Sequence, residues 1–117
     1  MSDSTEQVFN RHLQAFGARD LDGLLADYAP NATMILVGGP TVHGPTELKP
    51  LFEGFMQEFG RPEVKFDVLG TVIEGEIAAL TWTAETPEKI YDFGSETFVI
   101  RDGKIVSQVT AMKSRPR

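Results

Sequence analysis

The sequence predicts an α+β fold in which three helices precede a run of long antiparallel strands. Apolar residues recur at helical spacing in the first half of the chain and alternate with polar residues after Pro62. Short turn signals separate the later segments, and short turns join antiparallel neighbours. A chain of 117 residues has the length of one domain, so we expect a single domain over 1–117, flexible at 1–4 and 114–117.

Three helical segments are expected before residue 60. Residues 5–18 carry an apolar stripe behind a serine and a threonine that can cap a helix. Residues 20–29 form a short second helix, with Asp20 as its cap and Tyr28 on its apolar face. Residues 46–59 form the third, whose stripe is rich in phenylalanine. These helices can cover one face of a sheet.

The strands are expected from shorter apolar patterns. Residues 32–37 form a continuous apolar run, which predicts a short strand. Longer alternating segments follow at 63–74, 76–86, 89–101 and 104–113. Asp102 and Gly103 form a strong tight-turn signal between the last two. Long twisted strands make a sheet curl, so we expect a cone-shaped interior.

Composition excludes several classes of function. The net charge is −6, whereas a nucleic-acid surface needs clustered Lys and Arg, so we expect no nucleic-acid partner. The absence of cysteine excludes disulfides and thiolate chemistry. The polar N-terminus is unlike a signal peptide, and no apolar run approaches the ~20 residues of a membrane span. We therefore expect a cytoplasmic location and no membrane partner.

Three segments resemble the SnoaL-like and ketosteroid isomerase-like family of the nuclear transport factor 2-like superfamily. They are the stretch from His12 to Thr33, the His43-Gly44-Pro-Thr-Glu segment, and the Asp102-Gly-Lys-Ile hairpin. The resemblance covers nearly the whole chain. It implies a cone-shaped, curved antiparallel sheet, mixed at its edge, with three N-terminal helices enclosing a pocket. Members include isomerases, cyclases, hydratases and binding proteins, so the fold alone does not choose an activity.

The resemblance also implies positions for the catalytic groups of ketosteroid isomerase. The pocket tyrosine of that enzyme falls at His12, its protonated acid at Glu96, and its carboxylate base at Leu36. A leucine has no proton affinity, so steroid isomerisation by the usual mechanism is disfavoured. His12 and Glu96 remain as candidate catalytic residues, a general acid and base that share one apolar cavity. Two alternatives stay open: a buried pair that only orients a ligand, or two solvated side chains without a role.

The expected ligand pocket is lined by aromatic, methionine and other apolar side chains with two polar residues on the last strand. These residues are Phe16, Met34, Leu36, Phe52, Met56, Leu80, Trp82, Phe98, Gln108, Thr110 and Met112. The alternative is that part of this set is plain core. His43 lies in a loop that we expect near the cavity mouth, or simply exposed. Two distant histidines without supporting ligands make a weak metal site, so we expect no metal and no cofactor.

Aromatic and β-branched residues are also expected on the outer face of the sheet. They are Thr81, Thr83, Tyr91, Phe93, Thr97 and Val99. Such a face favours burial against a partner. The resemblance implies a two-fold dimer through this face, so we expect a homodimer.

Three functions are consistent with the sequence. The first is an isomerase- or lyase-type enzyme that uses acid–base chemistry on a small apolar molecule. The second is a non-catalytic protein that binds such a molecule, which the leucine at the base position favours. The third is a dimeric interaction module with an incidental cavity. The first two require an open cavity and the third does not.

Overall fold

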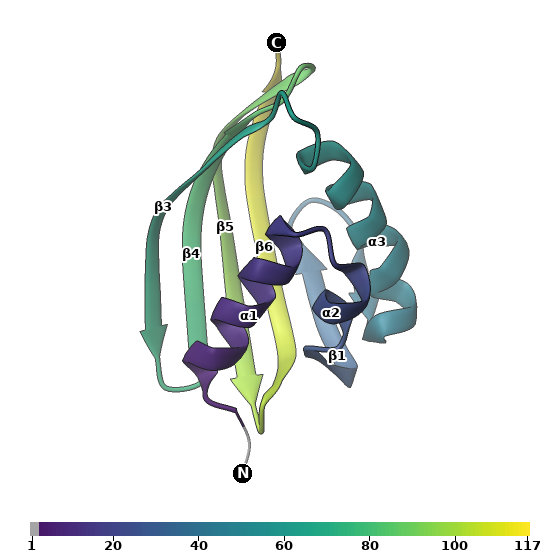
Figure 1. Ribbon diagram of the computed structural model, residues 1–117, viewed down its shortest axis with the longest axis vertical. Helices are drawn as coiled ribbons and strands as arrows, with labels where there is room; N and C mark the ends of the chain where they lie inside the picture. The colour runs from purple at the N-terminus through teal and green to yellow at the C-terminus, as the bar shows by residue number, and fades with distance from the viewer. Residues whose placement is uncertain (1–2) are drawn as a thin grey trace.

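The computed structural model describes residues 3–117, in which helices cover the concave face of a curved six-stranded sheet (Figure 1). In chain order the elements are α1 (Thr5–Gly17), α2 (Leu21–Leu25), β1 (Tyr28–Leu36), β2 (Thr41–His43), α3 (Gly44–Phe59), β3 (Lys65–Glu74), β4 (Ile77–Glu85), β5 (Lys89–Arg101) and β6 (Lys104–Pro116). The predicted α+β class is confirmed. Among the described residues, no helix combines the length and the apolarity that a membrane crossing would require.

The strands follow the order β2-β1-β6-β5-β4-β3 across the sheet. Neighbours pair antiparallel except β1 and β6, which run parallel, so the sheet is mixed toward one edge as expected. Helix α1 packs against β4 and β5, whereas α3 packs against β1 and β2. The centre of the concave face therefore lies between the two longer helices (Figure 1).

The second helix is shorter than predicted, and this difference matters for the site. The predicted helix over 20–29 ends at Leu25, and Tyr28 is the first residue of β1. The chain leaves the helix because pairing with β6 begins here: the backbone N–H of Ile105 donates to the carbonyl of Asp27 at 2.8 Å. Tertiary pairing overrides the local helical pattern.

Segments expected as a loop and as a flexible end belong to the sheet. Strand β2, which was not predicted, pairs with β1 and leads directly into α3. Residues 114–116 were expected to be flexible, but they pair with the start of β5. At the other end, Ser4 caps α1, while Met1 and Ser2 lie outside the described residues. The predicted turn is confirmed: Asp102 and Gly103 have φ values of 51° and 76°, as a type I′ turn requires.

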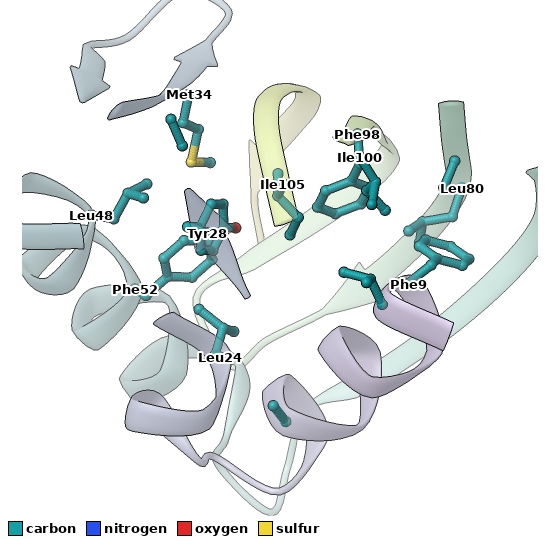
Figure 2. Close-up of a cluster of buried hydrophobic side chains, with 14 of the residues drawn as sticks. Phe9, Leu24, Tyr28, Met34, Leu48, Phe52, Leu80, Phe98, Ile100 and Ile105 are labelled. Atoms are coloured by element: carbon teal, nitrogen blue, oxygen red, sulfur yellow. The ribbon is translucent and has the colours of Figure 1, made fainter. Parts of the chain in front are cut away.

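The core forms where the helices meet the concave face of the sheet. Figure 2 shows side chains from the helices and from the sheet converging on this layer. They include Phe9, Leu24, Tyr28, Met34, Leu48, Phe52, Leu80, Phe98, Ile100 and Ile105, which are all buried. On β4 the buried residues alternate with partly exposed ones, as the sequence predicts.

A bulge in β5 changes which of its side chains face the core. The pairing of β5 with β6 shifts between Tyr91 and Phe93, so the alternation restarts at Gly94. Tyr91, predicted on the outer face, is instead 4 % exposed and donates a hydrogen bond to Glu58 on α3. After the bulge, Gly94, Glu96 and Phe98 share the inner face. The bulge therefore helps to place Glu96 inside the protein.

The outer face of the sheet carries a row of residues that are direct cross-strand partners. From β1 to β3 the row is Ile35, Val109, Thr97, Ala79 and Val72. Ile35, Val109 and Val72 are 41 %, 39 % and 64 % exposed. This outer row is apolar apart from Thr97 and crosses five strands. No helix covers it in Figure 1.

Candidate functional site

A cavity of about 80 Å³ lies between helices α1 and α3 and the concave face of the sheet. Its lining is His12, Leu13, Phe16, Met34, Phe52, Phe55, Phe66, Leu80, Trp82, Glu96, Phe98, Gln108, Thr110 and Met112. Most of this surface is aromatic or aliphatic. Phe66 is 41 % exposed, so one wall of the cavity reaches the surface. The volume is small beside the roughly 300–1,000 Å³ of typical ligand pockets, which favours a small molecule.

Most of the residues predicted for the site come together here. Both candidate catalytic residues line the cavity, as do Phe16, Met34, Phe52, Leu80, Trp82, Phe98, Gln108, Thr110 and Met112. The prediction from sequence missed Leu13, Phe55 and Phe66. Each occupies an apolar position next to a predicted pocket residue in the fold, so the hydrophobic pattern could have identified them.

Leu36, predicted in the pocket, does not line the cavity. It is the last residue of β1, and its backbone bonds to Gly39 and Pro40 in the turn that follows. Its side chain packs over this turn: a Cβ atom at Gly39 would lie 3.0 Å from Leu36 Cδ2. Of the residues on β1, Met34 is the one that reaches the cavity. The strand that carries the base in ketosteroid isomerase therefore contributes a thioether and no carboxylate.

Met56 and His43 also lie away from the cavity. Successive residues of a helix are about 100° apart, so Phe55 and Met56 fall on opposite flanks of Phe52. Phe55 turns toward the cavity, and Met56 packs near Leu21 on the far side of α3. His43 is exposed at the start of α3, with Nδ1 3.9 Å from the Glu47 carboxylate. It takes no part in this site.

Glu96 is held by three hydrogen-bond donors. Thr110 Oγ1 and Gln108 Nε2 donate to Oε1 at 2.7 and 3.0 Å, and Trp82 Nε1 donates to Oε2 at 2.8 Å. Burial among apolar groups raises the pKa of Glu96 above its usual value, although the three donors oppose this shift. Oε2 accepts only one of these bonds. A second partner can therefore approach it from the cavity.

His12 directs both ring nitrogens at buried neighbours. Nε2 lies 3.2 Å from the hydroxyl of Tyr28, and Nδ1 lies 3.5 Å from Oδ2 of Asp27. Neither neighbour lines the cavity. The side chain is 4 % exposed, and its ring also makes edge contacts with Phe52 and Phe98. A ligand would therefore meet the ring of His12 but not a free nitrogen.

Asp27 is a buried carboxylate between His12 and the surface. It is 2 % exposed, and its Oδ1 accepts a hydrogen bond from Arg11 Nε at 2.8 Å. Burial by itself would raise the pKa of Asp27. The hydrogen bonds and charges of His12 and Arg11 outweigh burial, so its pKa lies below the usual value. Asp27 is therefore the anionic partner of His12.

Tyr28 and Gln108 connect the two halves of the site. The Tyr28 hydroxyl donates to Gln108 Oε1, while Gln108 Nε2 donates to Glu96. Burial, together with the charges of Glu96 and Asp27, raises the pKa of Tyr28 well above its usual value. Tyr28 therefore remains a neutral hydroxyl. One hydrogen-bonded chain links His12 to Glu96, and Asp27 lies 3.5 Å from the other ring nitrogen of His12.

Asp27 and Tyr28 were not identified from the sequence. The pattern placed Tyr28 on an apolar helix face because residues 20–29 were expected to be helical. A shorter helix would have placed Asp27 and Tyr28 at the entry to a strand. Even so, no sequence spacing shows that this strand lies beside His12, because α1 and β1 meet only in the fold.

The chemistry that this arrangement allows is proton transfer. The cavity offers one half-buried carboxyl group with a free lone pair, in surroundings that shift its pKa. In residues 3–117 no three His, Asp or Glu side chains are placed to hold a metal ion together.

The family model for the SnoaL-like domain matches residues 9–108. The chain belongs to the SnoaL-like family. This match includes α3, most of α1 and almost all of the cavity lining. Within this SnoaL-like protein the matched segment ends at Gln108, so Thr110 and Met112 lie just beyond it.

Solved structures of low sequence identity share the fold. A candidate ketosteroid isomerase from Kribbella flavida is 13 % identical, with a TM-score of 0.77, over 97 % of this chain and 82 % of its own. A candidate polyketide cyclase from Sinorhizobium meliloti is 18 % identical, with a TM-score of 0.73, over 89 % and 93 %. TerC, co-crystallised with polyporic acid, is 15 % identical, with a TM-score of 0.73, over 93 % and 91 %. No curated protein matches the sequence.

Proposed function

We propose that this SnoaL-like protein is an isomerase- or lyase-type enzyme that uses acid–base chemistry on a small, largely apolar molecule. The observation that carries the proposal is Glu96: a half-buried carboxyl group with three protein donors and one oxygen still accessible from an aromatic cavity. A carboxyl group in such a setting suits proton transfer near neutral pH, because burial raises its pKa. Similar folds of a candidate ketosteroid isomerase and a candidate polyketide cyclase support this class.

In this mechanism Glu96 Oε2 takes a proton from the substrate. It returns that proton to another substrate atom in an isomerisation, or to the leaving group in an elimination. The aromatic walls exclude water and hold the apolar body of the substrate. His12, whose nitrogens are engaged by Tyr28 and Asp27, acts on Glu96 through the hydrogen-bonded chain. In this proposal His12 does not exchange a proton with the substrate itself, unlike the general acid–base role predicted from the sequence.

A second candidate is a non-catalytic protein that binds a small apolar ligand in the same cavity. It is favoured by the absence of a base on β1, where Met34 takes the cavity position. It is also consistent with the structure of TerC, which was crystallised with polyporic acid. A binder and an enzyme share the cavity, so product formation distinguishes them.

Replacement of Glu96 by glutamine tests the proposal. Small apolar carbonyl compounds are first screened by thermal shift, since a ligand bound only to the folded state raises the melting temperature. Each compound that binds is then incubated with the protein, and products are followed by NMR. We expect turnover by the wild type and at least a ~100-fold loss in Glu96→Gln, because general acid–base groups contribute roughly 10²–10⁴-fold.

Glu85→Gln provides a matched control, because Glu85 is a partly exposed residue of β4 that pairs with Arg117 away from the cavity. It should leave turnover unchanged. Equal turnover by Glu96→Gln and wild type would remove Glu96 from the mechanism. Binding by the wild type without product after long incubation would identify a binding protein instead.

We also propose that the protein forms a homodimer through the outer row, the apolar line from Ile35 to Val72 that crosses the sheet. Replacing Val109 with lysine puts a charge at the centre of this row, and burying an unpaired charge is costly. We expect wild-type protein to sediment as a dimer and Val109→Lys as a monomer. Val68→Lys is the control: Val68 is also exposed, at 51 %, but its β4 partner is the buried Trp82, so it lies on the other face. A monomeric wild type contradicts the proposal.

A further inference from the structure

We propose that the charge of Asp27 sets the direction of the hydrogen-bonded chain that ends at Glu96, and so keeps Glu96 as the proton acceptor of the site. Asp27 is then a positioning residue that acts through His12, Tyr28 and Gln108. The inference deepens the proposed function and rests on it for the catalytic use of Glu96. The direction of the chain is a separate claim, which can be tested without a substrate.

The inner end of the chain fixes the direction in which Tyr28 donates. Gln108 presents Nε2 to Glu96 Oε1 at 3.0 Å, so its Oε1 faces Tyr28. Trp82 Nε1 can only donate, and it also points at Glu96. A carboxylate accepts all of these bonds. Tyr28 must therefore donate its one proton to Gln108.

The donation by Tyr28 in turn fixes one proton on His12. Since the hydroxyl proton of Tyr28 is used toward Gln108, its oxygen can only accept from His12. His12 Nε2 lies 3.2 Å from that oxygen and must carry a hydrogen. The same direction of donation thus runs from His12 through Tyr28 and Gln108 to Glu96.

The outer end of the chain requires a second proton on His12. Within residues 3–117, neither His12 Nδ1 nor Asp27 Oδ2 has a hydrogen-bond partner, yet the two atoms are 3.5 Å apart. An unprotonated Nδ1 would place its lone pair against a buried carboxylate. A proton on Nδ1 satisfies both atoms, and a buried aspartate stabilises the imidazolium that results. His12 is then doubly protonated.

Asp27 is the one anion among the described groups that surround His12 directly. Tyr28 from β1 is neutral, and Phe52 from α3 and Phe98 from β5 contribute aromatic rings. Arg11 contacts the other oxygen of Asp27 and keeps that carboxylate ionised. The negative charge that balances the imidazolium therefore comes from Asp27.

The hydrogen bonds between His12 and Glu96 can all be reversed without a change in the total number of protons. In that state Glu96 carries a proton and donates to Gln108, whose side-chain amide is turned over. Gln108 donates to Tyr28, Tyr28 donates to Nε2, and His12 is neutral with one proton on Nδ1. The proton that His12 has lost is the proton that Glu96 has gained. The two states have the same net charge but distribute it differently, because only the first has a cation beside Asp27 and an anion at Glu96.

Asp27→Asn removes this charge while it preserves the shape of the side chain. The wild type at neutral pH should show both ring nitrogens of His12 protonated in ¹⁵N NMR, with exposed His43 as the second, reference histidine. Infrared difference spectra against Glu96→Gln should show Glu96 as a carboxylate. In Asp27→Asn we expect His12 to lose one proton and the spectrum of Glu96 to gain the carbonyl band of a protonated acid.

Asp92→Asn is the matched control, because exposed Asp92 pairs with Arg115 at the surface. It should change neither spectrum. Tyr28→Phe removes the hydroxyl that connects His12 to Glu96. We expect Glu96 to become protonated in this variant, while His12 keeps the proton on Nδ1. This variant decides the question if Asp27→Asn does not fold: a protonated-acid band supports the proposal, and an unchanged carboxylate overturns it.

Either of two results overturns the inference: a singly protonated His12 in the wild type, or an unchanged Glu96 spectrum in folded Asp27→Asn. These measurements need no substrate. They can fail while Glu96→Gln still abolishes turnover, and turnover can be unaffected by Glu96→Gln while the spectra behave as expected. The two proposals are therefore tested separately.

Discussion

Replacement of Gly94 by alanine is expected to destabilise the protein by about 3 kcal/mol. Gly94 lies directly opposite Trp82 on the neighbouring strand, and a Cβ atom at this position would be 2.1 Å from Trp82 Cε2. The indole cannot move freely, because it stacks on Phe66 at 4.9 Å and donates to Glu96 at 2.8 Å. The added methyl group must therefore break packing, a charge-assisted hydrogen bond, or both.

Urea denaturation measures this loss, and Trp82 is the single tryptophan, so its fluorescence reports the same site. We expect red-shifted emission in Gly94→Ala, because the displaced indole meets more water. Gly54→Ala is the control: Gly54 lies in α3, where a Cβ atom would have no described neighbour within 4 Å beyond its own stretch of helix. There alanine should stabilise the protein by roughly 0.5–1 kcal/mol, since glycine is a poor helix former. Equal stability of Gly94→Ala and wild type would contradict the packing argument.

The second large effect is expected for Asp27→Asn, which should lower the free energy of unfolding by about 3 kcal/mol at neutral pH. The substitution removes a buried charge that pairs with His12 and Arg11. Arg11 keeps its ion pair with Asp3, so the cost arises at the buried His12, which must give up a proton or keep its charge without a partner. Asp92→Asn removes one carboxylate from an exposed ion pair and should cost no more than about 1 kcal/mol. Equal losses in the two variants would show that burial of Asp27 has no energetic consequence.

The pH dependence of this difference follows from the direction of the pKa shift. The pKa of Asp27 is lower in the folded protein than in the unfolded chain, where it is about 3.9. Its contribution is therefore fully present above that value and is lost as the pH falls through the lower, folded pKa. We expect the stabilities of wild type and Asp27→Asn to converge in acid, as measured by urea titrations between neutral pH and about pH 2.

The contribution of Glu96 to stability depends on pH in the opposite direction. Burial raises its pKa, so the folded state holds the proton more tightly than the unfolded chain does. Its contribution is largest below the unfolded pKa and is lost as the pH rises through the folded pKa. The acid limb of the stability curve therefore reports Asp27, and a fall in stability as the pH rises above the unfolded pKa of Glu96 reports Glu96.

Local patterns in the sequence determined the elements and the class of the fold. The apolar stripes of α1 and α3 and the alternation of β4 each report which face is buried, because side-chain direction repeats with the period of the element. The turn at Asp102 and Gly103 follows from the backbone angles these residues tolerate. The apolar patterns identified most of the lining, whereas the resemblance to the SnoaL-like family placed His12 and Glu96 in the same cavity.

What only the tertiary structure decided depends on contacts between distant segments. The bulge in β5 reverses the face of Tyr91, and parallel pairing with β6 ends α2 early enough to place Asp27 and Tyr28 beside His12. The periodicity of apolar residues does not predict where a bulge occurs or which strand will be the partner. The sequence by itself therefore determined a SnoaL-like fold with an imidazole and a carboxyl group in its interior. The tertiary structure decided that Asp27, Tyr28 and Gln108 connect them, because hydrogen-bond partners are set by where strands meet in space.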